Sequence, residues 1–152
     1  MTETDIQRAL TRAFGLFDYR RFLVVPNASY GVGLHECDLL ALTASGYAHE
    51  IEIKVSVADL RRDGQKWHHH QSQRVKCLWF AAPAEMREAM QEHVPPEAGI
   101  ILINKCEGWP GWRQEIVRKP VIRRGARRFT DTERYDLARL GTIRYWTWAH
   151  KL

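Results

Sequence analysis

The stretch HECDLLALTASGYAHEIEIK, residues 35–54, decides the fold of this chain. Residues 39–42 are apolar on both faces, as in a strand covered on both sides, and residues 47–55 follow a short turn as the hairpin partner. Side chains two apart share one face of a strand, so the second segment has two rows. The charged row contains Glu50, Glu52 and Lys54, and the apolar row contains Ile51, Ile53 and Val55. The apolar row can pack against a helix, whereas the charged row needs another explanation.

Helices and strands alternate on both sides of this hairpin. Apolar spacing, capping residues and breaks at Gly or Pro place these elements. The expected elements are a helix at residues 3–14, a strand at 22–25 that Pro26 ends, a loop at 27–33, a helix started by the capping pair Ser56 and Asp59, a strand at 75–82, a helix at 84–93 and a strand at 100–103. The order helix, three strands, helix, strand, helix, strand predicts an α/β fold, with a mixed central sheet flanked by helices.

The last third of the chain is expected to add an edge strand at 114–117 and a final helix. Thr130 and Glu133 form a second capping box at the start of this helix. Its core-facing stripe is predicted to be Leu137, Leu140 and Ile143. With 152 residues and 45% hydrophobic content, the chain is long enough for one core and too short to favour two, which predicts a single domain over residues 1–152.

Two absences in the sequence predict the compartment. No apolar run reaches the roughly 18 residues that a membrane span needs, and the first residues lack the basic and then apolar pattern of a signal peptide. A cytoplasmic protein without a membrane partner is therefore expected. The three cysteines form no CxxC pair, which argues against a disulfide framework and against a zinc ribbon.

Positive charge is concentrated in one part of the sequence. The net charge of +5 and the pI near 9.3 favour a polyanionic partner without identifying it. Basic residues gather at 113–128, where Pro120 and Gly125 indicate a loop that can neutralise phosphates along a DNA backbone. The predicted phosphate contacts are Arg118, Arg123, Arg124, Arg127 and Arg128. A solvated basic loop is the alternative interpretation.

The charged row of the hairpin is a candidate metal site. Hard divalent cations such as Mg²⁺ bind carboxylate oxygens, and Asp38 and Glu52 on neighbouring strands can supply them together with the backbone carbonyl of Ile53. Lys54 shares the face of Glu52 and can orient a water or offset charge on a phosphate. Glu50 lies further from the strand end and is a lesser candidate. A strand with a polar side facing water is the alternative, but Asp38 at the start of a buried strand needs a partner such as a metal.

These residues resemble the motif of the PD-(D/E)XK nuclease superfamily, an aspartate on one strand and Glu-x-Lys on the next. Asp38, Glu52 and Lys54 match the motif, although Cys37 stands where a proline often precedes the aspartate. The superfamily shares a restriction-endonuclease-like αβββαβ core, so the resemblance covers residues 1–105 and leaves a basic loop and a C-terminal helix at 106–152. It also implies a metal-binding acid on the first helix, for which Glu3 is the best match and Asp5 a close second.

The sequence after the motif resembles small bacterial and phage DNA-repair nucleases of the MmcB-like kind. That resemblance implies that the helix after Glu-x-Lys packs beside the site, where Lys66 and one of the three histidines at 68–70, taken here as His68, would contact phosphate. Gln71 and Gln73 are alternatives. Three consecutive histidines make a poor metal cage because their side chains diverge on any regular element, so exposed or packed histidines are the competing interpretation.

The sequence thus predicts a Mg²⁺- or Mn²⁺-dependent deoxyribonuclease of DNA repair, recombination or phage DNA processing, in a bacterial or phage-infected cell. Endonuclease action is the expectation, although the motif does not distinguish it from exonuclease action. The alternatives are a DNA-binding module of the same fold with little or no catalysis, in which Trp109 and Trp112 stack on unpaired bases, and a purely structural domain. Superfamily members often act as dimers, so a homodimer is a further expectation, without a dedicated interface in the sequence.

Overall fold

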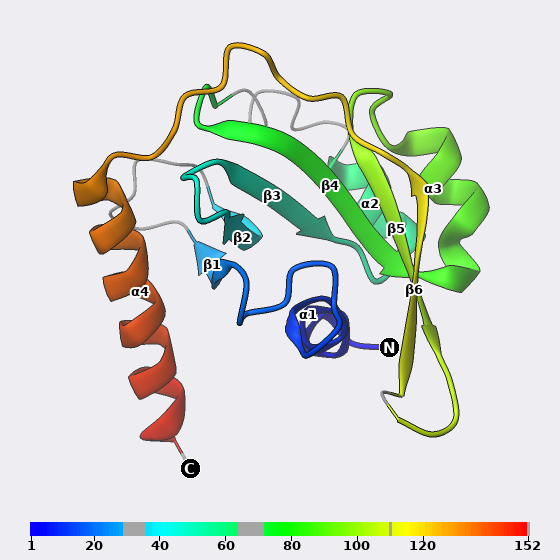
Figure 1. Ribbon diagram of the computed structural model, residues 1–152. Coiled ribbons are helices and arrows are strands. Elements are labelled where there is room, and N and C mark those ends of the chain that lie inside the picture. The colour runs from blue at the N-terminus through cyan, green and yellow to red at the C-terminus, as the bar shows by residue number, and fades with distance from the viewer. Residues whose placement is uncertain (29–35, 64–71, 110, 152) are drawn as a thin grey trace.

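A six-stranded sheet forms the centre of the protein in a computed structural model, which describes residues 1–28, 36–63, 72–109 and 111–151 (Figure 1). The strands, in their spatial order, are β1 (Leu23–Ala28), β2 (Cys37–Leu42), β3 (Ala48–Ile53), β4 (Val75–Pro83), β5 (Gly99–Lys105) and β6 (Trp112–Arg118). The helices are α1 (Glu3–Thr11), α2 (Val57–Asp63), α3 (Arg87–His93) and α4 (Asp131–Ala149), and the 3-10 helix η1 (Ala84–Met86) precedes α3.

The sheet is mixed. Strands β1, β2 and β3 form antiparallel pairs, β3, β4 and β5 are parallel, and β6 closes the other edge antiparallel to β5. Helix α2 connects β3 to β4, and η1 with α3 connects β4 to β5, because parallel neighbours need a crossover. The predicted order of elements from the first helix to β5 is confirmed, and the arrangement is consistent with a restriction-endonuclease-like fold.

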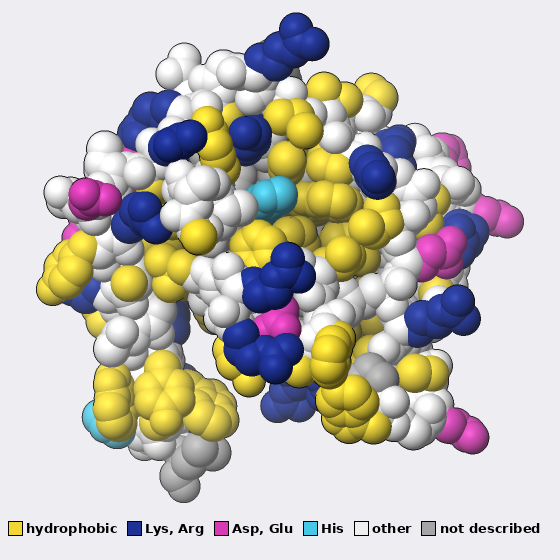
Figure 2. All heavy atoms as spheres, viewed as in Figure 1, with side chains coloured by type: hydrophobic (Ala, Val, Ile, Leu, Met, Phe, Trp, Pro, Cys, Tyr) yellow, Lys and Arg dark blue, Asp and Glu magenta, His cyan; other side chains and the backbone are white. Residues whose placement is uncertain are grey.

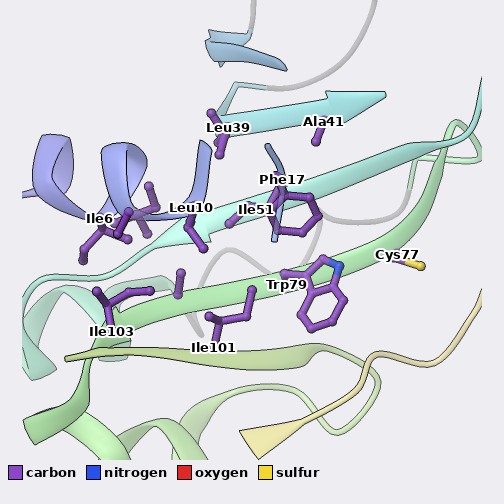
Figure 3. Packing of buried hydrophobic residues seen from close by; sticks show 13 residues of the cluster. Ile6, Leu10, Phe17, Leu39, Ala41, Ile51, Cys77, Trp79, Ile101 and Ile103 are labelled. Carbon is purple, nitrogen blue, oxygen red and sulfur yellow. The ribbon is translucent and has the colours of Figure 1, made fainter. Parts of the chain in front are cut away.

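Helix α1 covers one face of the sheet. In Figure 3, Ile6 and Leu10 of α1 lie beside Ile51 of β3, and all three side chains are fully buried. The rings of Phe17 and Trp79 extend this cluster, with their centroids 6.0 Å apart in an edge-to-face arrangement. The apolar row of the hairpin therefore packs against a helix as predicted, except that Val55, beyond the end of β3, is 43% exposed.

The opposite face of the sheet is covered by the other three helices. Leu60 of α2 and Met90 of α3 pack with Phe80 of β4, whereas Leu137 of α4 packs with Val25 of β1. Strands β2 and β4 are thus covered on both sides. This double burial explains why their sequences are almost continuously apolar.

Residues 119–130, named here the crossing segment, run from β6 to α4 across the end of the sheet where β4 begins (Figure 1). Backbone hydrogen bonds attach the segment to the sheet and its loops. Val121 N–H donates to Glu97, Arg123 N–H to Lys76, Arg127 N–H to Gln73 and Phe129 N–H to Gly46. Among the described residues, no helix is long and apolar enough to cross a membrane.

Three local predictions are wrong. Strand β1 continues through Pro26 to Ala28, because β1 is an edge strand and an edge position tolerates a residue without an N–H. Helix α1 ends at Thr11 instead of residue 14. Ile143 is 47% exposed, because the buried part of α4 is limited to its first turns around Leu137, with Leu140 partly buried. The predicted loop at 27–33 falls in β1 up to Ala28, and the rest lies outside the described residues.

The tryptophans divide between the core and the surface. Trp79 is buried at 8% exposure, whereas Trp109, Trp146 and Trp148 are more than half exposed. Figure 2 shows hydrophobic side chains gathered at the lower end of α4 and, across a notch, near the lower end of the β5–β6 hairpin. These three indole rings are therefore accessible to solvent.

Candidate active site

The strand register brings the two motif carboxylates together. In the β2–β3 hairpin, Leu39 is opposite Ile51 and Leu40 is opposite Glu50. Continuing this register by one residue places Asp38 opposite Glu52, and residues opposite each other in an antiparallel pair share a face. Lys54 follows directly after the end of β3. The Asp and Glu-x-Lys pattern of the sequence is therefore one structural unit at the ends of two neighbouring strands.

Asp38 is fixed by contacts on both sides. Its Oδ2 accepts a hydrogen bond of 2.7 Å from the backbone N–H of Ile53, at the C-terminal end of β3. Its carbonyl oxygen accepts a 3.3 Å hydrogen bond from Nε2 of Gln7, which also donates to Oε1 of Glu3 at 3.0 Å. The first turns of α1 are thereby connected to the start of β2.

Glu52 and Lys54 form a buried ion pair. Lys54 Nζ lies 3.3 Å from Oε2 of Glu52, and the two residues are 5% and 6% exposed. The ammonium is also 5.9 Å from the centre of the Phe80 ring. Charges taken out of water need close compensation, which each partner supplies to the other. The alternative of an ordinary strand with its polar side in water does not describe this row.

Glu3, rather than Asp5, is the acid of α1 that faces the motif. Burial raises the pKa of Glu3 above its ordinary value, the carboxylates of Asp38 and Asp59 raise it further, and the Lys54 ammonium opposes the shift. Asp5 instead accepts a 2.9 Å hydrogen bond from the backbone N–H of Thr2 and completes the capping box of α1. Of the two acids, Glu3 is therefore the one that interacts electrostatically with the motif.

Three further polar residues belong to the surroundings of the motif. Glu50, ranked low from the sequence, is 1% exposed and lies in the same buried row as Glu52. Burial raises the pKa of the Cys37 thiol, and Glu50 adds more to this shift than either motif carboxylate. Gln7 and Asp59 were not selected from the sequence. Their signals were the i, i+4 spacing of Gln7 from Glu3 and the position of Asp59 in the helix that directly follows the motif.

The donor set suits a hard divalent cation. Asp38, Glu52 and the Ile53 carbonyl offer oxygen atoms, which Mg²⁺ and Mn²⁺ prefer. Within the ranges that the structure describes, no group of three or more Asp, Glu, His or Cys side chains is arranged to hold one ion. Mg²⁺ commonly uses only one or two protein carboxylates together with waters and substrate phosphate. The residues present therefore fit this ion chemically without forming a three-carboxylate cage.

The arginines predicted to contact DNA are largely engaged within the protein. The guanidinium of Arg118 donates to three backbone carbonyls at the end of α3 and the loop after it. These acceptors are Val94 at 3.2 Å, Pro95 at 2.6 Å and Ala98 at 2.8 Å. Arg123 donates to the carbonyl of Ser72 at 3.4 Å. Both side chains attach one part of the chain to another, which is a structural role.

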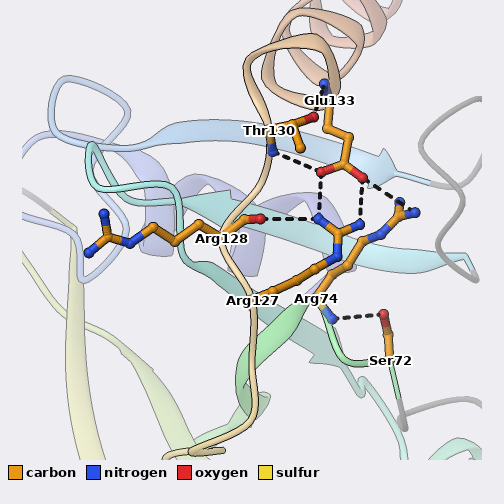
Figure 4. Close-up of polar contacts among 6 residues, drawn as sticks. All are labelled: Ser72, Arg74, Arg127, Arg128, Thr130 and Glu133. Carbon is orange, nitrogen blue, oxygen red and sulfur yellow. Dashed lines mark hydrogen bonds and ion pairs between the residues drawn. The ribbon is translucent and has the colours of Figure 1, made fainter.

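Arg127 belongs to a network at the start of α4 (Figure 4). It donates to Oε1 and Oε2 of Glu133 at 2.7 and 2.9 Å, and Arg74 lies 3.4 Å from the same carboxylate. Arg128 lies with its guanidinium 5.1 Å from the centre of the Tyr47 ring, and Arg124 is exposed. The remaining two predicted contacts, Lys66 and His68, lie outside the described residues.

The crossing segment and the motif lie at opposite ends of the parallel strands. Arg123 of the segment bonds to Lys76 at the start of β4, whereas Lys54 N–H donates to Ala81 near the end of β4. The two attachment points are five residues apart, which corresponds to about 16 Å along a strand. The crossing segment is thus not adjacent to the motif carboxylates in the fold.

The sheet, its crossover helices and the carboxylate row define a mixed α/β protein consistent with a restriction-endonuclease-like fold. A family model described as "DNA repair protein MmcB-like" matches residues 2–144. The chain therefore belongs to the MmcB-like family of DNA repair proteins, which indicates a role in DNA repair with DNA as a partner.

One solved structure shares the fold. It is SPO1766, a protein of unknown function from Silicibacter pomeroyi, with 20% sequence identity and a TM-score of 0.65 over 97% of this chain and 88% of that chain. At this identity the likeness concerns the fold alone. No curated protein matches the chain at a significant level.

Proposed function

We propose that this protein is a Mg²⁺- or Mn²⁺-dependent deoxyribonuclease of DNA repair. The observation that supports the proposal most is the gathering of Asp38, Glu52 and Lys54 at the ends of two paired strands, with Lys54 3.3 Å from Glu52 and Asp38 bonded to Ile53. A carboxylate pair beside an ammonium, in a DNA repair family, suits hydrolysis of a phosphodiester bond.

Each residue has a distinct role in this proposal. Asp38, Glu52 and the Ile53 carbonyl would hold the metal, and Glu3, the acid expected from α1, would act on it through a water of the ion. When bound, the metal supplies positive charge to the phosphate and lowers the pKa of a water. The hydrogen bond from Ile53 N–H orients the Asp38 carboxylate. Lys54 offsets negative charge that develops on the phosphate. Burial is the main cause of the raised pKa of Glu3, and the repulsion from Asp38 that adds to it is of the kind that a divalent cation would relieve.

Cleavage assays with matched variants test the proposal. Single-stranded, duplex, nicked and branched DNA would be incubated with Mg²⁺ or Mn²⁺, using wild type, Asp38→Asn, Glu52→Gln and Lys54→Ala. We expect the carboxylate variants to lose cleavage, and Lys54→Ala to retain DNA binding but lose about 10²–10³-fold in rate. Glu88→Gln on the exposed side of α3 is the matched control. The proposal fails if no substrate is cleaved or if cleavage survives in Asp38→Asn and Glu52→Gln.

A second candidate function is a DNA-binding module without catalysis. Two observations favour it: Lys54 is engaged with Glu52 in a buried pair, and the described residues hold no ready three-ligand metal group. Calorimetry separates the two functions. Salt-dependent DNA binding in the presence of EDTA, with no heat on titration of Mn²⁺, would favour the binding module, whereas Mn²⁺ binding abolished by Glu52→Gln would favour the nuclease.

A further inference from the structure

A pocket of about 500 Å³ opens between the C-terminal end of α1 and the strand β6. It lies apart from the motif, at the other end of α1. Aromatic, aliphatic and cationic side chains line it. They include Arg12, Phe14, Leu16, Trp112, Arg113 and Ile116. A surface that combines aromatic rings with arginines suits a ligand with a flat ring and a negative charge.

Two exposed aromatic rings lie at the edge of this pocket: Phe14 lines it, and Trp109, which is not part of the lining, contacts Phe14. Phe14 and Trp109 are each 76% exposed, and their rings meet edge to face with centroids 5.6 Å apart. The two rings contact each other and therefore form an exposed apolar patch. Such a patch marks an interaction site more often than a single exposed residue does. At 76% exposure, much of the surface of each ring is accessible to a stacking partner.

The backbone around Phe14 is built to hold its ring outward. Phe14 has φ = 68°, a left-handed conformation that costs free energy in a residue with a large side chain. Asp18, 3% exposed, stabilises this loop because its carboxylate accepts hydrogen bonds from the backbone N–H of Phe14 and Arg20 and from the Arg20 side chain. The Arg20 guanidinium in turn lies 5.7 Å from the Phe14 ring centre. A strained and well-supported exposed ring is typical of a functional position.

The cations of the pocket lie beside these rings on rigid elements. Arg113 is an exposed residue of β6, and Arg12 follows the end of α1. The side chain of Gln114 connects the two walls, because it donates to the Ala9 carbonyl and accepts from Leu16 N–H, both at 2.9 Å. The two walls of the pocket are therefore held together by the fold.

We propose that this pocket binds an unpaired nucleotide of DNA, whose base stacks on Phe14 or Trp109 while Arg113 and Arg12 contact its phosphate. In a duplex the base faces are covered by their neighbours, whereas a single-stranded base exposes its face to an aromatic side chain. The inference rests on the proposed function and narrows its substrate. The nine residues of α1 separate the pocket from Glu3 by about 14 Å. A substrate with a single-stranded segment a few nucleotides from the cleaved bond would contact both places.

Binding measured in EDTA tests the pocket without depending on catalysis. Fluorescence anisotropy would follow a labelled oligothymidylate of about 12 nucleotides and a blunt duplex. Trp109→Ala and Phe14→Gly should each weaken binding of the oligothymidylate about fivefold to 150-fold and leave the duplex nearly unchanged. Arg113→Ala should weaken it and reduce its salt dependence. Phe14→Gly removes the ring while relieving the left-handed backbone, so loss of folding would not explain its effect.

Controls and conservative changes complete the test. Tyr135→Ala removes an aromatic ring that is 67% exposed on α4, and Arg139→Ala removes an exposed arginine of the same helix. Neither should alter binding of the oligothymidylate, and Trp109→Phe should keep most of it. The inference would be overturned if wild type, Trp109→Ala and Phe14→Gly bound the oligothymidylate with equal affinity. It would also be overturned if these variants lost affinity equally for the oligothymidylate and for the duplex. If wild type cleaves no DNA but the pocket variants still lose single-strand binding, the nuclease proposal fails, whereas the proposal that the pocket binds an unpaired nucleotide is supported.

Discussion

Two charged regions of this protein differ in what their charges do. At the motif, Glu52 and Lys54 are buried and paired with each other, at the ends of strands. In the crossing segment, Arg123 and Arg127 attach an irregular stretch of chain to the sheet and to α4. The shorter charged pattern is the one with the features of a chemical site, and the longer basic stretch is mainly a structural connection. The density of charged residues in a sequence therefore does not distinguish a chemical site from a structural connection.

The physical difference lies in solvent exposure. The side chain of Arg127 is 44% exposed, whereas the side chain of Lys54 is 7% exposed. An exposed ion pair is screened by water and contributes little, whereas a buried charge that loses its partner is strongly destabilising. Burying a charged row is unfavourable unless its members are compensated, so the row at the motif is more consistent with a functional requirement than with stability alone.

Lys54→Ala should give the largest loss of stability. Removing the ammonium leaves the Glu52 carboxylate buried beside an apolar side chain, and such a change costs about 3–5 kcal/mol of the free energy of unfolding. Urea unfolding at neutral pH measures it, with Lys105→Ala, an exposed lysine of β5, as the control.

The double variant Glu52→Leu with Lys54→Met sharpens this result. It replaces both charges by apolar side chains and should lose less stability than Lys54→Ala alone, because no uncompensated charge remains. A loss below about 1 kcal/mol for Lys54→Ala would mean that the pair behaves like a surface ion pair, and the contrast between the two regions would be wrong.

The fold was accessible from the sequence because its signals are local. The alternation of Ile51 and Ile53 with charged residues, the continuous apolar strands and the capping box at Thr130 each fix an element without knowledge of its neighbours. The strand through Pro26 was not accessible, because whether a proline is tolerated depends on a strand being at the sheet edge. The exposure of Ile143 likewise depends on how far α4 extends beyond the sheet.

The candidate site was accessible in part. The spacing of Glu52 and Lys54 follows from the period of a strand, and the register that brings Asp38 to them follows from the hairpin. The role of Gln7 was not accessible, since its partner Asp38 is 31 residues away in the sequence. The arginines of the basic stretch show the same limit. Whether a guanidinium faces DNA or a backbone carbonyl is decided by residues far along the chain, as the acceptors of Arg118 show.

Arg118→Ala should have the next largest effect on stability. Its guanidinium satisfies three carbonyls around the end of α3, and hydrogen bonds from a charged donor contribute enough that their joint loss should cost about 2 kcal/mol. Arg124→Ala, in the same basic stretch but exposed, should stay within about 0.5 kcal/mol of wild type. Thermal and urea unfolding of the two variants compare them directly. Similar stabilities would show that Arg118 has no structural role and is available for DNA.

Glu133→Gln should have the smallest effect, and one that depends on pH. The hydrogen bonds from Arg127, followed by that from the Thr130 N–H, hold the pKa of Glu133 at about 2, below its ordinary value of 4.5. A depressed pKa means that the carboxylate stabilises the folded state above the ordinary value and loses this contribution as pH falls toward 2. The variant should be less stable than wild type by on the order of 1 kcal/mol at neutral pH. The difference should shrink between about pH 4.5 and 2 in urea unfolding, and a difference that stays constant over this range would contradict the assignment.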